Sequence, residues 1–219
     1  MKKYYMSFIA LLAALMLLVA CSNNETSSSR NEKSSQKSEA EGDSLKTDGP
    51  LEKVGQWKTE KNGTKVTLKK VAKVNKTFNL NPIKMNIDEV KVIERSNLQA
   101  SDKELLKEKG IKSNKFLTIQ FAYNIENKSD QEILFQGIKI ITTNTKKQID
   151  ASHDDMIQNR EETGTGIFHG QVRKEGYIVV PCLNTNPDDL NYINIKIGDV
   201  LKNEDASILH EGINEKINF

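Results

Sequence analysis

Four residues close together in the sequence could coordinate a divalent cation: Asp150, His153, Asp154 and Asp155. Carboxylate oxygens and imidazole nitrogens are common ligands of such ions. The spacing of these residues nevertheless matches no calcium-binding loop. A short acidic segment of this kind is more often a solvated loop, so the sequence favours a loop and leaves a metal site as the alternative.

Motifs of known enzymes are absent from the sequence. It contains no Gly-x-Ser-x-Gly nucleophile elbow and no His-Glu-x-x-His zinc motif. His169 and His210 have no reactive neighbour in sequence, and the single tryptophan, Trp57, is more typical of a core position than of a ligand platform. We therefore predict no catalytic residue and no cofactor. A surface hydrolase or metal-dependent enzyme, with a site assembled from distant loops, is the alternative.

The two cysteines are expected to differ in role. Cys182 lies in the apolar run Val179-Val180-Pro181-Cys182-Leu183, which indicates a small buried side chain in a strand. Cys21 instead follows Leu18-Val19-Ala20, at the end of an apolar run and before a polar one. This is the pattern of a bacterial lipobox, in which a peptidase cuts just before a cysteine that carries diacylglycerol. The sequence therefore predicts lipidation of Cys21 and no disulfide.

The first twenty residues have the three parts of a signal peptide. Lys2 and Lys3 provide the positive start, and residues 8–19 are uncharged and too few to span a bilayer. We expect residues 1–20 to be removed, so that Cys21 anchors the mature chain in the membrane, at its outer face. An ordinary secretory leader is one alternative. Another is that the leader releases a signalling peptide, from the small apolar stretch 14–20.

The net charge of the mature chain argues against one class of partner. The formal net charge of +2 includes Lys2 and Lys3, so their removal leaves the mature chain at zero. A nucleic-acid partner is not expected, because phosphate binding needs a clustered basic surface.

Residues 22–49 have almost no apolar side chain and cannot offset the entropy of ordering. We predict a disordered polar tether over residues 21–53 and a folded domain over residues 54–219.

The folded domain shows the patterns of short strands. Asn62-Gly63 lies between two such runs, a strong hairpin signal because both residues accept positive φ. In the second run, Val66, Leu68, Ala72 and Val74 are expected to share a face that Lys70 interrupts, at an edge or a bulge. A change of parity at Asp88-Glu89 predicts another bulge. We expect strands over Trp57–Glu60, Thr64–Val74, Met85–Ile93, Lys115–Ile125, Ile133–Thr142, Ile167–Val172, Gly176–Leu183 and Tyr192–Gly198, with a final short pair at Ile208–His210 and Lys216–Phe219.

A single short helix interrupts this pattern. Ser101 and Glu104 have the spacing of a capping box, which predicts a helix over Asp102–Lys109 that ends at Gly110. Residues 143–166 are polar and show no clear period. Seven or more short strands with turns between them favour an all-β fold, an antiparallel β-sandwich of a single domain.

The order of three segments resembles a known group of domains. The segments are Asn124–Asp130, which turns after a core strand, then Ile138–Ile141, and then the pair Gly166–Val172 and Glu175–Pro181. The resemblance is to the immunoglobulin-like (telokin-like) domains of unknown function on lipoproteins of Gram-positive bacteria, and it covers about Gly55 to Val200. It implies an immunoglobulin-like sandwich outside the cytoplasmic membrane and transfers no catalytic residue. Taken together, we expect a non-enzymatic, lipid-anchored binding module whose partner is an envelope protein or polymer.

Overall fold

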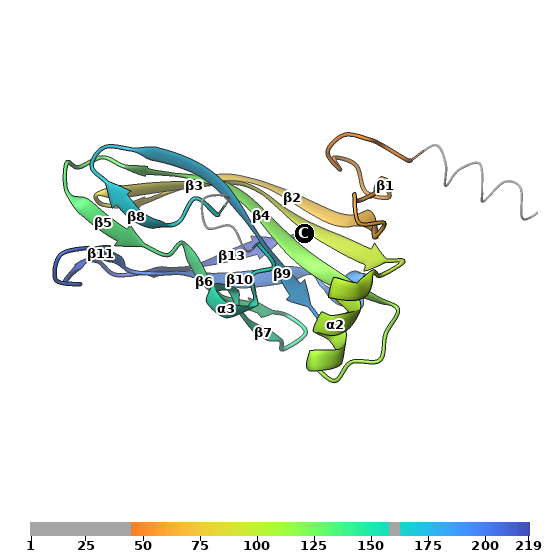
Figure 1. The fold of residues 1–219 in the computed structure, drawn as a ribbon. Helices are drawn as coiled ribbons and strands as arrows, with labels where there is room; N and C mark the ends of the chain where they lie inside the picture. Colours follow the sequence, from red (N-terminus) through yellow and green to blue (C-terminus); the bar gives the residue numbers. More distant parts are fainter. Residues whose placement is uncertain (1–44, 158–162) are drawn as a thin grey trace, which may run out of the picture.

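The computed structural model describes residues 45–157 and 163–219, and antiparallel strands dominate it (Figure 1). One layer is a five-stranded sheet in the order β1-β2-β3-β4-β9. Four of its five strands are long: β2 and β3 form a hairpin, and β4 pairs with both of its neighbours over ten or more residues. The bounds are β1 Trp57–Thr59, β2 Lys65–Leu80, β3 Ile83–Ser96, β4 Lys115–Asn127 and β9 Arg173–Cys182.

The other layer consists of two four-stranded antiparallel sheets placed end to end. Successive strands of the chain lie in different sheets of this layer at four places, and the amide of Gly198 donates to the carbonyl of Gly137 (N–O distance 2.8 Å) across the junction. One sheet has the order β13 (Ile213–Asn218), β10 (Tyr192–Ile197), β6 (Ile138–Thr143), β7 (Gln148–Asp150); the other has the order β12 (Ile208–His210), β11 (Val200–Lys202), β5 (Glu132–Phe135), β8 (Gly166–His169).

The two layers share one core, to which every second residue of the strands contributes. Phe121 of β4 is fully buried, and so are Phe135 of β5 and Phe168 of β8, which belong to the opposite layer. Burial of apolar area in this cluster is the main source of stability, because the described residues contain one cysteine, Cys182, and it is free. Cys182 is buried at the end of β9, as its apolar neighbours predict.

The five-stranded sheet also carries apolar residues on its outer face. Leu51, from the segment before β1, packs on Val66, Leu68 and Ile93. Leu106 of α2 (Ala100–Glu108) packs on Phe116 of β4, which lies in the same cross-strand row as Val66. These two segments cover part of the outer face. The remaining helices are α3 (Ala151–Asp154) and a short 3-10 turn, η1 (Pro187–Asp189).

The hairpin and bulge predictions are confirmed, with changes in detail. The β1–β2 turn contains Asn62-Gly63, but only Gly63 has positive φ (95°), whereas the Asn62 side chain accepts from the Thr64 amide. The ladder between β2 and β3 shifts between Leu68 and Lys70, and the ladder between β3 and β4 shifts between Ile87 and Glu89. Strands β2 and β3 extend beyond the expected bounds and meet at a cis Asn81–Pro82 bond.

Four expectations about local structure are wrong. The bulge after Leu68 reverses the parity of β2, so Val66 and Leu68 face outward while Ala72 and Val74 face the core. The final strands do not pair with each other: β12 pairs with β11, and β13 pairs with β10. The single strand expected over Ile133–Thr142 is two strands of different sheets, β5 and β6, separated at Gly137, which has positive φ (68°). Strands β7 and β11 and helix α3 were not predicted, because each is too short to show a period.

The capping-box prediction for the helix is also wrong. The helix starts at Ala100, and its N-cap residue, Gln99, makes no side-chain cap hydrogen bond. Gly110 does follow the helix with positive φ (67°), as expected. Asp102, in the first turn of the helix, makes a buried contact with Thr64 and with Arg95 of the sheet.

Contacts with the sheet begin before the predicted domain start at residue 54. The Trp57 amide donates to the Leu45 carbonyl, and Leu51 is buried. Cys21, the leader and most of the predicted tether lie outside the described residues. Among the described helices, none is long and apolar enough to cross a membrane.

Candidate functional site

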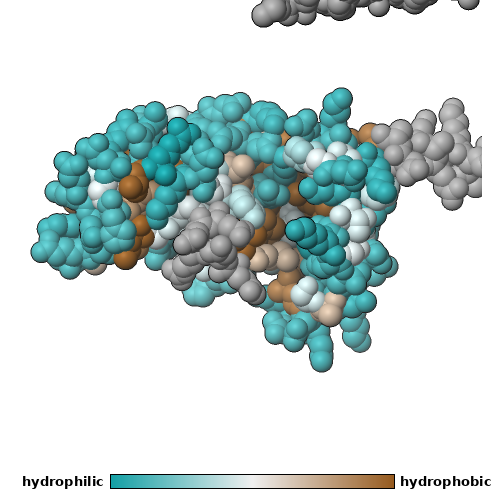
Figure 2. All heavy atoms as spheres, turned by 45° about the horizontal axis from the view of Figure 1, so that its top comes forward, coloured by the Kyte–Doolittle hydropathy of each residue, from teal (hydrophilic) through white to brown (hydrophobic). Residues whose placement is uncertain are grey.

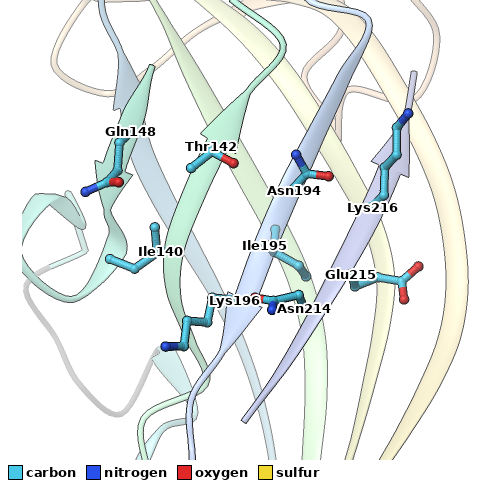
Figure 3. A pocket seen from close by; sticks show the side chains of 9 residues that line it. All are labelled: Ile140, Thr142, Gln148, Asn194, Ile195, Lys196, Asn214, Glu215 and Lys216. Atoms are coloured by element: carbon cyan, nitrogen blue, oxygen red, sulfur yellow. The ribbon is translucent and has the colours of Figure 1, made fainter. Parts of the chain in front are cut away.

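The outer face of the sheet formed by β7, β6, β10 and β13 is polar and slightly hollowed, with a volume of about 660 Å³ (Figure 3). Strand register places Gln148, Thr142, Asn194 and Lys216 opposite one another in a row that crosses all four strands. We call these four residues, together with Ile140, Lys196 and Asn214 of the next row, the polar face. Inward residues of the same strands, such as Ile193 and Ile195, are buried, so alternation alone directs the polar ones to solvent.

Several groups on the polar face have free hydrogen-bonding capacity. In the part of the chain that the structure describes, the side chains of Asn194, Lys196 and Asn214 make no hydrogen bond and no ion pair. The Lys216 ammonium lies over the Tyr192 ring, with 3.8 Å between Nζ and the ring centroid. Amides that both donate and accept therefore alternate with two cations.

The acidic residues next to the polar face already have partners. Glu215 points to the edge of the layers, where its Oε2 lies 2.7 Å from Nζ of Lys76 on β2. Asp150 accepts from the Ser152 amide and lies 3.0 Å from Nδ1 of His153. These contacts leave the two lysines of the polar face as its uncompensated charges, so the face favours an anionic ligand.

A narrower groove, of about 460 Å³, lies on the outer face of the five-stranded sheet. Its floor contains Lys91 and Gln120, which are opposite each other on β3 and β4. Apolar residues form the sides: Leu51 and Ile93 on one, Met156 and Val179 on the other. We call this hollow the sheet groove.

Two ion-pair networks line the sheet groove. Arg95 donates from Nε to Oδ1 of Asp102 (3.1 Å) and makes two bonds to the Glu60 carboxylate (3.0 and 2.7 Å). Burial lowers the pKa of Arg95, but these carboxylates outweigh it and raise the pKa overall. Lys91 pairs with Glu89, which also binds Lys73. Burial opposes ionisation of Glu89, yet its two lysine partners bring its pKa below the usual value.

Of the four candidate metal residues, only Asp150 and His153 come together. Asp154 pairs with Lys109 (2.9 Å), and Asp155 accepts from the amides of Ile157 and Val179. Burial raises the pKa of Asp155, although these amide bonds act in the opposite direction. Within the described ranges, no three His, Cys, Asp or Glu side chains lie close enough to hold a metal ion.

The other residues singled out in the sequence have structural contacts. His169 Nδ1 lies 2.7 Å from Oε1 of Glu132, and His210 Nδ1 lies 2.6 Å from the carbonyl oxygen of Glu211. Trp57 is half-buried, with the ammonium groups of Lys65 and Lys46 over its ring (4.0 and 5.5 Å to the centroid). Sequence reasoning missed both the polar face and the sheet groove. The alternation in β10 gave the only signal of the polar face.

The sheet at the far end carries an apolar row on its outer face. Register places Ile208, Leu201, Leu134 and Ile167 opposite one another on β12, β11, β5 and β8, and Ile208 and Ile167 are 59% and 40% exposed. Figure 2 shows a narrow hydrophobic patch within hydrophilic surface at the end of the molecule that carries β5 and β8. The row contains four side chains, far fewer than a stable protein interface needs.

Comparisons with known proteins give a fold but no function. No family model matches the chain, and no curated protein matches it. Among solved structures, the chain is similar to a functionally unknown protein from Listeria monocytogenes EGD-e, with 14% sequence identity and a TM-score of 0.50. The match covers 70% of this chain and 86% of that one. At this identity the likeness shows that the two chains share a mostly β fold, and it transfers no activity.

Proposed function

We propose that this chain is a non-enzymatic binding module that is lipid-anchored at Cys21 on the outer face of the cell membrane and binds an anionic polymer of the cell envelope through the polar face. The single observation that carries the binding role is the row of amide and ammonium groups across four strands. The lipobox and the polar tether support the location. The shared core of two packed layers is compatible with the immunoglobulin-like sandwich implied by the three segments described above.

An extended sheet face suits a polymer better than a small molecule. Its groups repeat along the strands at two-residue intervals, so a chain of repeating anionic and hydroxyl groups can bind at several points at once. Lys196 and Lys216 contribute charge attraction, and the amides accept from hydroxyls and donate to anionic oxygens. Since each contact is solvent-exposed, binding should be weak per site and sensitive to salt.

Replacing both Lys196 and Lys216 with Ala is expected to lower binding to purified Gram-positive cell walls about ten-fold at low salt, because both uncompensated charges are lost. Co-sedimentation of the full chain with walls measures this directly. Walls stripped of their phosphodiester polymers by acid should bind the unaltered protein as weakly as the variant.

The matched control replaces Lys103 and Lys107, exposed residues of α2, with Ala. It changes the net charge equally and should leave wall binding within two-fold. Equal loss in both variants would mean that net charge, not the polar face, determines binding. No binding of the unaltered protein to either kind of wall would reject the polymer proposal.

Replacing Cys21 with Ala is expected to abolish incorporation of labelled palmitate into the protein. The reason is that Cys21 is the predicted site of the acyl chains, two of which make anchoring stable, at about 0.8 kcal/mol per buried methylene. Cys182→Ala is the control and should keep full labelling. Labelling that survives Cys21→Ala would disprove the anchor without affecting the wall-binding result.

A further inference from the structure

We propose that the sheet groove is a second binding site, separate from the polar face, for a molecule with one anionic head and an alkyl chain. The two sites lie on opposite layers: the polar face belongs to β7, β6, β10 and β13, and the groove lies on the outer face of β2, β3, β4 and β9. The groove has the volume of a small-molecule site and combines apolar walls with a few polar groups.

The head group would bind at Lys91 and Gln120. The Lys91 side chain is only 10% exposed, and its ammonium, with three donors, has Glu89 as its one partner among the described residues. The Gln120 side chain, directly opposite on β4, makes no hydrogen bond in the described part of the chain. An ammonium and an amide side by side at the bottom of a groove can both donate to a carboxylate or phosphate oxygen.

Charge in the groove favours an anion over a cation. Three basic residues line it, Lys58, Lys91 and Arg95, against one acidic residue, Glu60. Arg95 is fully engaged by Glu60 and Asp102, and Glu89 is shared by Lys73 and Lys91. Lys91 is thus the buried cation with donors still available, and a second anion beside it would complete its hydrogen bonds.

The alkyl chain would lie between the two walls. Leu51, Val66 and Ile93 on one side belong to the small apolar cluster under the segment before β1. Met156, Ile157 and Val179 line the other side, where the Met156 amide donates to the Val179 carbonyl and ties this wall to β9. Burial of methylenes between them contributes affinity independent of the head group.

Equilibrium dialysis of the full chain against four labelled ten-carbon probes tests this proposal: decanoate, decyl phosphate, decanol and decylamine. Decanoate or decyl phosphate, or both, should bind at least ten-fold more tightly than decylamine. The affinity for decanol should lie between that for the anions and that for decylamine. A preference for decanoate indicates a fatty-acid ligand, and a preference for decyl phosphate indicates a lipid phosphate. Equal affinity for decylamine and the anions, or no binding of either anion, would overturn the proposal.

Lys91→Met should weaken anion binding about ten-fold and leave decanol within two-fold, because a charge-assisted hydrogen bond is lost while the apolar walls remain. Glu89 retains Lys73 in this variant, so no buried carboxylate is left unpaired. Gln120→Leu is a second variant that changes no charge and should weaken anion binding several-fold. Lys107→Met, on the surface of α2, is the matched control. Anion affinity that is unchanged in both groove variants would reject the assignment of the head-group site.

Discussion

Replacing Arg95 with Met is expected to lower the free energy of unfolding by about 3–5 kcal/mol, because it removes the cation from a buried ion pair and leaves the carboxylate behind. Asp102 is only 2% exposed, and its described partners are Arg95 and the hydroxyl of Thr64, which donates at 2.7 Å. Without Arg95, the Asp102 charge keeps a single neutral donor in a place that water hardly reaches. Denaturant titration of the full chain measures the change.

A second replacement identifies the cause of this loss. Asp102→Asn, added to Arg95→Met, should recover part of the lost stability, because a neutral amide does not need a cation. Arg173→Met is the control: Arg173 is exposed and lies 3.7 Å from Glu175, so its loss should cost no more than about 0.5 kcal/mol. If the buried and the exposed arginine gave equal losses, the network around Asp102 would not stabilise the fold.

Replacing Phe121 with Ala is expected to cost about 3–5 kcal/mol of unfolding free energy through the cavity it leaves. Phe121 is fully buried in the middle of β4, between Val90 on β3 and Ile178 on β9. It belongs to the core that both layers share. The loss should therefore destabilise the whole domain rather than one sheet, and Trp57 fluorescence and far-UV circular dichroism should show the same shifted midpoint.

Asn124, three residues further along β4, provides the matched control. It lies on the same strand but on the opposite face, where its side chain is half-buried outside the core, so Asn124→Ala should remain within about 0.5 kcal/mol. Phe121→Leu should fall between the two, since it leaves a smaller cavity. Different midpoints for the two spectroscopic probes would show that the layers unfold separately and would contradict a single cooperative core.

Local patterns in the sequence were sufficient to predict much of the fold. Strict alternation over Lys115–Ile125 identifies β4, and the parity change at Asp88-Glu89 identifies a bulge that the register of β3 confirms. Gly63 could be assigned to a turn because few other residues adopt its φ. These features depend on neighbours in sequence, and a single chain shows them directly.

Features that depend on distant partners could not be predicted. Asp102 and Glu104 both follow Ser101 closely, and only the position of Arg95 on β3 explains why Asp102 turns inward. Likewise, the pairing of β13 with β10 rather than with β12 is set by the shared core and not by the strands' own residues. The polar face requires the register of four strands, and the sheet groove requires Leu51 and Met156 to approach from two separate segments.

Cys182 gives the domain a practical property. Cys182 is 1% exposed, and burial raises the pKa of its thiol, so the reactive thiolate is scarce and shielded in the folded protein. Within the domain, maleimide dyes and spin labels will therefore react with a cysteine introduced on the surface and not with Cys182. Pairs of such labels, one beside the polar face and one beside the sheet groove, can report distances within the domain without removal of Cys182.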